Sequence, residues 1–503
     1  MAIRLSKSRI MAAKQCPKRL WLDVHRPDLR TPDENSQRRL DRGRRLHEVF
    51  RGIYPNGELL GDHLPLQQAL QRTEQYIADG RTHPLFEATF NADGVWVRAD
   101  MLRGRFDGVH LTEVKSSTRV KAHHLVDCAI QYWLVRQAGH PIAGMAVAHV
   151  DRRFVYPGDG NYSGLLRHVD VTDKLDELLP QVPEWIETGL VALASDEEPT
   201  VGTGPHCNSP FACPFIAYCS PPETEYPLKI LHGGGRIVSQ LRSQGINDVR
   251  DIPTGVLHKP LHERIRRASI SGTAYLDPAA AGRLRLMPFP RYHLDFESVQ
   301  FAVPRWPGTR PYEQLPFQWS CHKQTGTDAI EHLDFLDTSG EPPMRACAES
   351  LVDALGDHGP VFVYSRFEGA VLGKLAARFD DLSAPLHTIR ERMVDLLPIV
   401  RRHYYHPAMK GSFSIKAVLP TVAPGLDYKM LGDVQHGTAV QSTYEAIIAS
   451  QAENPADAAE RSRQVNELRA YCRLDTLALV RLVQFLEHTA TPPHHSDSPP
   501  VPS

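Results

Sequence analysis

Three cysteines recur at even six-residue steps within this chain of 503 residues, at Cys207, Cys213 and Cys219. Thiolates spaced this regularly beside proline and phenylalanine are more typical of a metal centre than of packing. Cys16, near the start of the chain, is the best candidate for a fourth ligand. Four thiolates suit a 4Fe-4S iron-sulfur cluster or a structural zinc ion, and the spacing alone does not choose between them. Either centre would tie residue 16 to residues 207–219 and close one domain.

Carboxylates with a neighbouring lysine form a second candidate site. Strands are expected at residues 85–90, 95–103 and 109–116, since turn residues separate these runs. Asp100 lies on the second strand, and Glu113 and Lys115 share one face of the third because side chains alternate along a strand. Facing carboxylates repel unless a cation lies between them, and Mg²⁺ suits such an oxygen site. The lysine would then orient water and stabilise charge on a phosphate.

Two predicted helices flank these strands. The basic stretch at residues 36–50 places Gly43 and His47 one helical turn apart. The stretch at residues 121–137 has one apolar face and presents Gln131 and Tyr132 elsewhere.

Taken in chain order, these motifs resemble the RecB/Cas4-type iron-sulfur nucleases, whose core is a restriction-endonuclease-like PD-(D/E)xK fold. The resemblance implies that His47, Asp100 and Glu113 hold Mg²⁺ or Mn²⁺ and that Lys115 is the catalytic lysine. It also implies that Gln131 and Tyr132 lie near DNA, and that the cluster on Cys16, Cys207, Cys213 and Cys219 is structural. The chain departs from that family in lacking the literal Pro-Asp and in spacing its last cysteines C-x5-C-x5-C instead of C-x2-C-x5-C.

Residues 221–288 form a junction between two halves. A proline-rich linker begins at Ser220, and short helices joined at glycines are expected beyond it. Backbone amides of a glycine-rich turn bind phosphate in helix-hairpin-helix modules. A plain helical connector is the alternative, and no specific site is assigned here.

The second half, residues 289–488, carries another set of acids. Strands are expected at residues 291–297, 312–320 and 360–365, and a helix at residues 466–486. Asp295 and Glu297 share a strand face, and Tyr471 and Asp475 share a helix face. Residues 410–420, which include Lys410 and Lys416, would either contact phosphates or form a solvated helix start.

This second set resembles the DEDD-type 3′-to-5′ exonucleases of the tyrosine subgroup (DEDDy), which have an RNase H-like fold. The resemblance implies that Asp295, Glu297 and Asp475 hold two divalent ions about 4 Å apart while Tyr471 positions water. Glu368 is the best match for the remaining acid, where such families usually have aspartate, and Asp395 is its rival. The half also resembles the uncharacterised DUF2779 domain in residues 293–297, 312–320 and 411–420.

Composition limits the class of protein. With 57 basic and 59 acidic residues, the chain is not a polycation that coats nucleic acid. It shows neither a signal-peptide pattern nor an apolar run long enough to span a membrane, so we expect a cytoplasmic protein with free cysteines. Residues 489–503 are expected to be a disordered tail.

The sequence therefore predicts an α/β protein: a PD-(D/E)xK domain with an iron-sulfur cluster at residues 1–220, a helical connector, and an RNase H-like domain with a mixed sheet. The expected function is metal-dependent (exo)deoxyribonuclease activity in DNA repair, recombination or defence, with RNA as an alternative substrate and a helicase or other repair protein as a partner. One alternative is a nucleic-acid-binding scaffold that has lost catalysis in one or both halves. A zinc-stapled interaction protein is another, but it leaves Asp100, Glu113 and Lys115 unexplained.

Overall fold

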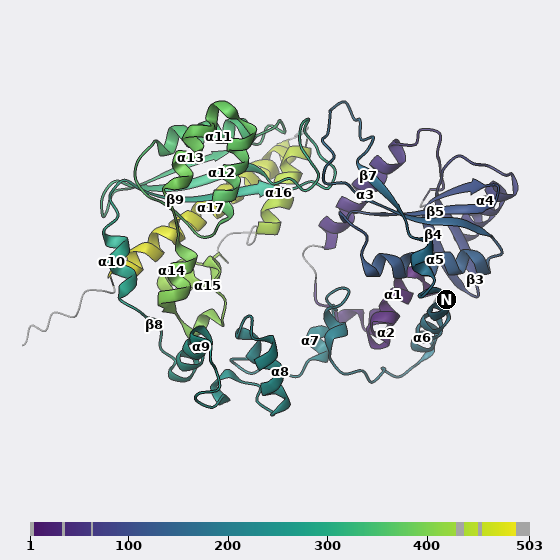
Figure 1. The fold of residues 1–503 in the computed structure, drawn as a ribbon, viewed down its shortest axis with the longest axis horizontal. Coiled ribbons are helices and arrows are strands. Elements are labelled where there is room, and N and C mark those ends of the chain that lie inside the picture. The colour runs from purple at the N-terminus through teal and green to yellow at the C-terminus, as the bar shows by residue number, and fades with distance from the viewer. Residues whose placement is uncertain (1–4, 33–35, 62–63, 429–436, 451–454, 489–503) are drawn as a thin grey trace, which may run out of the picture. The chain divides into compact units, whose positions relative to one another are not determined.

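The computed structural model describes residues 5–32, 36–61, 64–428, 437–450 and 455–488 (Figure 1). The chain forms two compact units. The first comprises residues 1–222 and 301–313, and the second comprises residues 223–300 and 314–503. Both combine helices with a mixed sheet, so the protein belongs to the mixed α/β class. The tail predicted at residues 489–503 lies outside the described residues.

The first unit is built on a seven-stranded mixed sheet. Its main order is β2 (Glu58–Leu59), β3 (Leu85–Ala92), β4 (Val95–Arg105), β5 (Gly108–Lys115), β6 (Ile142–Val150) and β7 (Leu166–Asp170), and β1 (Leu5–Ser6) also pairs with β4. β3, β4 and β5 form an antiparallel meander, which confirms the predicted one to within a few residues. β5 and β6 run parallel, joined through helix α5.

Helices cover both faces of this sheet. They are α1 (Lys7–Gln15), α2 (Pro17–His25), α3 (Ser36–Gly52), α4 (Leu66–Ala78), α5 (Ala122–Gln137), α6 (Val182–Ala194) and the short α7 (Ile216–Cys219). Leu111 of β5 packs in one core with Ile130 of α5, whereas Val114 packs in another with Phe50 of α3. The alternation of side chains along β5 therefore separates an α5 face from an α3 face.

β4 has two partners on one edge, and they diverge. β5 pairs with its residues 101–105, and β1 pairs in parallel with Val95 and Trp96. Asp100 lies in the fork between these ladders, where its Oδ2 accepts a hydrogen bond of 2.6 Å from the Val114 amide. Because α1 follows β1 directly, the fork also brings the start of α1 beside the end of β5.

Residues 301–313 interrupt the second half and cluster with the first unit. The Tyr156 amide donates to the Thr309 carbonyl, and the Tyr312 hydroxyl donates to the Ser116 carbonyl. Tyr312 has a left-handed backbone with φ of 57°. The strand predicted at residues 312–320 is therefore wrong at its start, because pairing begins only at Leu315.

The second unit contains a five-stranded mixed sheet in the order β11 (Ile330–Leu336), β10 (Leu315–Gln324), β9 (Arg291–Val299), β12 (Val361–Val363) and β13 (Met393–Asp395). β10 is antiparallel to both neighbours, and β12 runs parallel to β9 and β13. Around it lie α11 (Met344–Leu355), α12 (Phe367–Arg378), α13 (Ser383–Glu391), α14 (Leu396–His403), α15 (Ile415–Val422), α16 (Gly437–Ala449) and α17 (Pro455–His488). α17 contacts β9 and β10, which places its residues over the middle of the sheet.

Short helices occupy the predicted connector: α8 (Gly235–Ser243), α9 (Pro260–Ser271) and α10 (Ala279–Arg285). β8 (Tyr275–Leu276) pairs with β14 (Tyr404–Tyr405). Leu231 and Ile265 share a core cluster with Tyr404 and Leu482. The connector residues from 223 onward are thus packed into the second unit by apolar burial, the main driving force for such docking.

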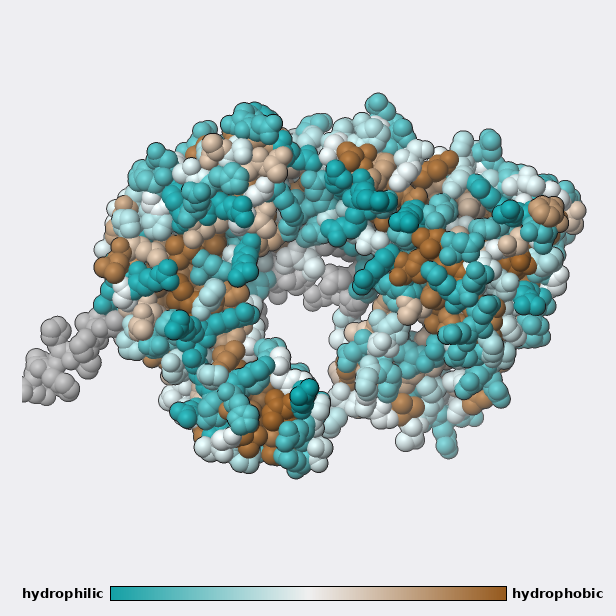
Figure 2. Space-filling model, viewed as in Figure 1, coloured by the Kyte–Doolittle hydropathy of each residue, from teal (hydrophilic) through white to brown (hydrophobic). Residues whose placement is uncertain are grey.

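Polar residues dominate the face seen in Figure 2, and apolar residues form separate small groups on it. Within the described part of the chain, no helix combines the length and apolarity needed to cross a membrane.

Candidate active sites

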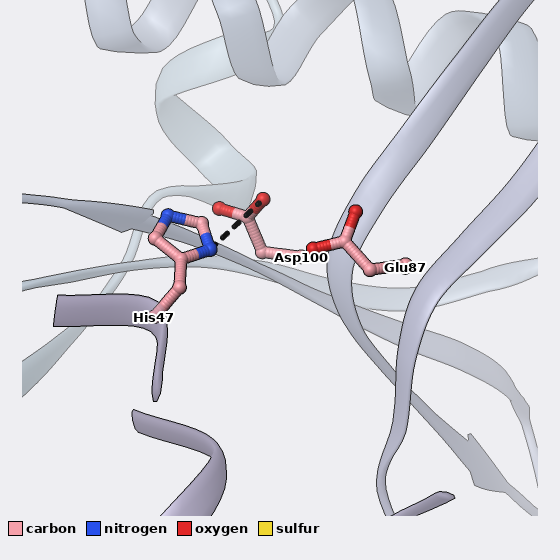
Figure 3. Close-up of side chains that lie close together, drawn as sticks. All are labelled: His47, Glu87 and Asp100. Carbon is pink, nitrogen blue, oxygen red and sulfur yellow. Dashed lines mark ion pairs between the residues drawn. The ribbon is translucent and has the colours of Figure 1, made fainter. Parts of the chain in front are cut away.

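His47, Glu87 and Asp100 meet in the first unit, each from a different element. They come from α3, β3 and β4, and one ligand atom of each lies within 4.8 Å of the others. His47 Nδ1 is 4.0 Å from Asp100 Oδ1, and Figure 3 shows the three side chains turned toward a common point. One imidazole nitrogen and two carboxylates form a donor set that fits a divalent cation such as Mn²⁺ or Mg²⁺.

Glu87 is a member of this group that the sequence analysis missed. It sits opposite Asp100, since the pairs Phe86–Met101 and Ala88–Ala99 flank them in the ladder. Its φ of 63° is unusual for a residue other than glycine. Strained backbone of this kind tends to cluster at functional sites, where the surroundings impose it. The available signal was a single acid inside the apolar run at residues 85–90.

Glu113, predicted as a third metal ligand, lies beside Asp100 but has other partners. Its Oε1 accepts hydrogen bonds from Lys115 Nζ at 2.6 Å and from Lys7 Nζ at 3.1 Å. Its Oε2 accepts one of 2.7 Å from Gln131 Nε2. The structure therefore places Asp100 beside Glu113 and Lys115, with Glu113 bound by two lysines and by Gln131.

Asp127 and Lys7 complete this cluster, and neither was predicted. Asp127 contacts Lys115 Nζ at 2.5 Å and Lys7 Nζ at 2.8 Å. Gln131 Nε2 donates to Asp127 at 3.2 Å as well as to Glu113. Asp127 lies one helical turn before Gln131, so the helix face of Gln131 was a usable signal. Lys7 offered none, because its position depends on the pairing of β1 with β4.

Burial and charge separate the two acids of the cluster. Burial and the nearby Asp100 and Asp127 carboxylates raise the pKa of Glu113 to about 7, against the effect of the lysines. Burial also acts to raise the pKa of Asp127, but Lys7 and Lys115 outweigh it and hold that pKa well below its usual range. Asp127 therefore stays ionised, and Glu113 is the carboxyl group that titrates near neutrality.

Tyr132 occupies a different environment from Gln131. Its half-buried side chain packs against the core shared with α5, whereas Gln131 is fully buried and bonded to Glu113. The predicted motif of two neighbouring residues thus places one side chain in the cluster and the other against apolar groups.

In the second unit, Asp295, Glu297 and Asp475 converge as predicted. Single oxygens of the three carboxylates lie within 4.8 Å of one another. Burial and repulsion from Asp475, Glu297 and Glu368 raise the pKa of Asp295 well above its ordinary range. Burial and repulsion from Asp475 and Glu368 do the same for Glu297, against the effect of Lys416. Burial likewise raises the pKa of Asp475 to about 6. A cation among these acids would relieve the repulsion, so the donor set fits Mg²⁺ or Mn²⁺.

Glu368 and Asp395 were rivals for the fourth acid. Glu368 is buried in the first turn of α12, accepts a 3.3 Å hydrogen bond from Ser365, and contributes to the raised pKa of Asp295. Burial raises its own pKa to about 7. Asp395 instead caps α14, where its side chain accepts from the Leu397 amide at 3.0 Å. Glu368 therefore acts on Asp295, and Asp395 acts on Glu368, but neither belongs to the group of three acids that lie within 4.8 Å. Asp395 also caps the start of α14.

Two tyrosines and a lysine adjoin Asp475. Tyr428 donates a 2.5 Å hydrogen bond to Asp475 Oδ1, and hydrogen bonding by Tyr471 also lowers the pKa of Asp475. Lys416 Nζ lies 4.7 Å from the ring centre of Tyr471 and 5.0 Å from that of Tyr428. Burial lowers the pKa of Lys416, while the carboxylates of Asp475, Glu297 and Asp295 act to raise it. Tyr428 was missed because no local pattern relates it to residue 475.

All four predicted cysteines line one cavity in the first unit: Cys16, Cys207, Cys213 and Cys219. Gln15 helps to form it by donating 2.8 Å hydrogen bonds to the His206 and Phe211 carbonyls. Among the described residues, no three of the sulfur atoms lie within 4.8 Å of one another. The four predicted ligands therefore share one cavity, but within the described residues their sulfurs form no close group.

Comparison with known proteins identifies one domain. Residues 292–414, within the second half, match the family model described as a domain of unknown function (DUF2779). One solved structure that matches is described as the crystal structure of SSO0001, with 15% sequence identity and a TM-score of 0.20. The match covers 43% of this chain and 85% of that one. A likeness with so low a score carries no argument about fold or function. No curated protein matches the chain.

Proposed function

We propose that the protein is a divalent-metal-dependent nuclease that hydrolyses phosphodiester bonds of DNA, with a PD-(D/E)xK-like first unit and an RNase H-like second unit. The observation that carries the proposal is the convergence of Asp295, Glu297 and Asp475 within 4.8 Å. Asp475 is buried, and Asp295 and Glu297 are partly buried. Carboxylates this close together repel one another unless a cation binds among them. Phosphodiester hydrolysis is a reaction that such carboxylate-held ions promote.

In the second unit, Asp295, Glu297, Asp475 and Glu368 would hold Mg²⁺ or Mn²⁺. Bound ions supply an activated water molecule and neutralise charge on the phosphate. Tyr428 orients Asp475 through its hydrogen bond, and Tyr471 offers a hydroxyl at the same carboxylate. Lys416, which lies beside both rings, would contact a phosphate oxygen of the substrate.

In the first unit, His47, Glu87 and Asp100 would hold a divalent ion. Lys115 would stabilise charge on the substrate phosphate, while Asp127 fixes its ammonium group. The four cysteines would bind the cluster that ties α2 to the end of the unit, a structural role supported by the packing of Cys207 and Cys213 against Trp21 and Phe215.

The experiment is a nuclease assay on anaerobically purified protein. Labelled single-stranded and double-stranded DNA and RNA are incubated with Mg²⁺ or Mn²⁺, and the wild type is compared with Asp295→Asn and Lys115→Met. We expect cleavage that requires the metal and falls at least about 100-fold in the variant of the responsible site. Absence of cleavage on every substrate, with folded and metal-binding protein, would refute the proposal.

A second candidate, a first unit that binds nucleic acid without cleaving it, is favoured by one specific observation. Both oxygens of Glu113 are already bound by lysines or Gln131, so metal binding there requires at least one of these contacts to break. If this candidate holds, Asp295→Asn abolishes all cleavage, whereas Lys115→Met leaves the rate unchanged.

A further inference from the structure

A polar hollow of about 440 Å³ lies on the first unit, and its lining includes none of the acids described above. Its polar lining includes Arg103 and Arg105 of β4, His110 and Thr112 of β5, His168 of β7 and Tyr54, which follows α3. None of the described residues that line it is acidic. Ligand pockets of this volume are usually mostly apolar, so a lining of arginine and histidine indicates an anionic ligand.

The register of the sheet brings these side chains together. Arg103 pairs with His110 and Met101 pairs with Thr112, so alternate residues of both strands project into the hollow from one face. Gly144 lies beside His110 on β6, and a Cβ there would come within 2.8 Å of the His110 ring. The absence of a side chain at Gly144 therefore leaves the space that the His110 ring occupies.

Two buried polar atoms of the lining lack a hydrogen bond in the described structure. They are Arg103 Nε and Thr112 Oγ1, and the Thr112 side chain belongs to a residue that is only 1% exposed. A buried polar group without a partner costs about 1–3 kcal/mol, so such groups usually meet a ligand or water. Both atoms are closed to solvent in the described structure, so an oxyanion in the hollow would accept hydrogen bonds from them after a rotation of the two side chains.

The charged side chains that line the hollow are Arg103 and Arg105. Burial lowers the pKa of His110 and of His168, and the Arg103 guanidinium lowers both further. The guanidinium of Arg103 lies 4.7 Å from the Tyr54 ring centre, and the Tyr54 hydroxyl is 3.2 Å from His168 Nε2. Two acids lie close to the lining residues. Asp107 Oδ1 is 3.8 Å from Arg105 Nε, and the Asp170 carboxylate acts to raise the pKa of His110.

The hollow shares its supporting elements with the His47–Glu87–Asp100 group. Arg103 follows Asp100 by three residues of β4, or about 10 Å. Tyr54 follows His47 by seven residues along α3 and its end, or about 10 Å. Phosphates of one nucleic-acid strand are spaced about 3.4 Å along a duplex axis. A strand held at the group would thus reach the hollow within a few nucleotides.

We propose that this hollow binds a phosphate group of the nucleic-acid strand whose phosphodiester is held at His47, Glu87 and Asp100. This inference rests on the proposed function and names a substrate contact of the same site. The ligand chemistry is a phosphate oxyanion, which a nucleic-acid backbone, a mononucleotide or inorganic phosphate would each provide.

The test measures binding of the full-length protein to labelled single-stranded DNA by fluorescence anisotropy in EDTA, where no cleavage occurs. Two variants are compared with the wild type: Arg103→Gln at the base and Arg105→Gln/His168→Gln at the exposed rim. The control is Arg167→Gln, because Arg167 precedes His168 on β7 and projects to the other face. Thermal melting verifies that each variant is folded.

We expect DNA binding to be about tenfold weaker in both hollow variants and unchanged in the control. The slope of log Kd against log salt concentration should fall by about one for each arginine contact that is lost. Wild-type DNA affinity in both folded variants would overturn the inference. Loss of inorganic phosphate or mononucleotide binding, measured by calorimetry, with DNA binding unchanged would also overturn it and assign the hollow to a free phosphate. DNA binding is measured without metal, so it can be interpreted even if the protein shows no nuclease activity.

Discussion

Tyr428 donates a hydrogen bond of 2.5 Å to Oδ1 of Asp475, a residue 47 positions later on α17. The hydroxyl counteracts burial, which raises the pKa of Asp475. Replacing Tyr428 with phenylalanine should therefore raise that pKa further and free the carboxylate to rotate. Loss of such a supporting contact typically weakens metal binding 10-fold to 100-fold. We expect a weakening of about this size for Mn²⁺ in Tyr428→Phe, measured by calorimetry at pH 7.

The matched control is Tyr404→Phe. Tyr404 is a buried tyrosine of the same unit whose hydroxyl bonds to Thr421 at 3.0 Å, among apolar core residues. It should lose stability without losing Mn²⁺ affinity. Equal Mn²⁺ affinity in Tyr428→Phe and the wild type would show that Asp475 needs no help from this hydroxyl.

Local periodicity explains what the sequence could predict about these sites. Asp295 and Glu297 share a face because a strand repeats every two residues, and Tyr471 and Asp475 share one because a helix repeats every 3.6. These relationships need no knowledge of the rest of the chain. The strand meander was predictable for the same reason, since turn residues separate its apolar runs.

Contacts across the sequence were not predictable in this way. Lys7 reaches Glu113 over 106 residues because β1 joins the edge of β4, and Tyr312 bonds to Ser116 over 196 residues. Both contacts depend on tertiary pairing that no local pattern encodes. Glu87 was missed for a further reason: a left-handed backbone within a strand overrides the alternation from which side-chain direction is read.

Asp295→Asn should stabilise the metal-free protein at alkaline pH. The pKa of Asp295 is raised in the folded state, so the folded protein binds the proton more tightly than the unfolded chain. The stability of the wild type therefore falls as pH rises above the ordinary aspartate range, and asparagine removes this penalty. We expect the melting temperature in EDTA to rise by about 2–4 °C per kcal/mol gained at pH 8, and to change less at pH 4.

Divalent metal should reverse the order of the two melting temperatures. Mg²⁺ or Mn²⁺ should raise the melting temperature of the wild type and have a smaller effect on Asp295→Asn, because binding to the folded state stabilises it. Asp353→Asn, at an exposed position on α11, serves as the control. A metal-free Asp295→Asn variant that melts below the wild type at pH 8 would contradict a mutually repelling carboxylate group.

Lys115→Met should destabilise the first unit, because Lys115 bridges Glu113 and Asp127 at 2.6 and 2.5 Å. Removing Lys115 leaves Glu113 and Asp127 with only Lys7 as a cationic partner among the described residues. Loss of a partner costs up to about 3–5 kcal/mol in fully buried pairs, and less here, where Lys7 remains and Lys115 is 23% exposed. Urea unfolding measures the loss. The double variant Lys115→Met/Glu113→Gln should recover part of it, and strictly additive effects in this double-mutant cycle would show that the two side chains do not interact.

His322 should make the second unit sensitive to acid. Burial lowers its pKa to about 3, and its Nδ1 lies 2.8 Å from the Thr476 hydroxyl. The unfolded chain binds a proton near pH 6.5 that the folded protein excludes, so stability is lost as pH falls from about 6.5 toward 3. His322→Gln should flatten this dependence in urea unfolding between pH 7 and pH 5. His387→Gln, at an exposed site on α13, should leave the slope unchanged, and an equally steep slope in His322→Gln would assign the sensitivity to other groups.

Cys16, Cys207, Cys213 and Cys219 should bind one metal centre that the first unit needs for stability. They line a common cavity, and burial together with the neighbouring thiols raises the pKa of Cys213 and Cys219 in the metal-free state, so binding must displace protons. We expect anaerobically purified protein to contain iron and sulfide, and Cys213→Ser to lose both and to melt at lower temperature. Cys128→Ala, a buried cysteine of α5 outside the cavity, should keep its iron. Stoichiometric zinc without iron would refute the iron-sulfur assignment while retaining the four ligands, and full iron content in Cys16→Ser would remove Cys16 from the set.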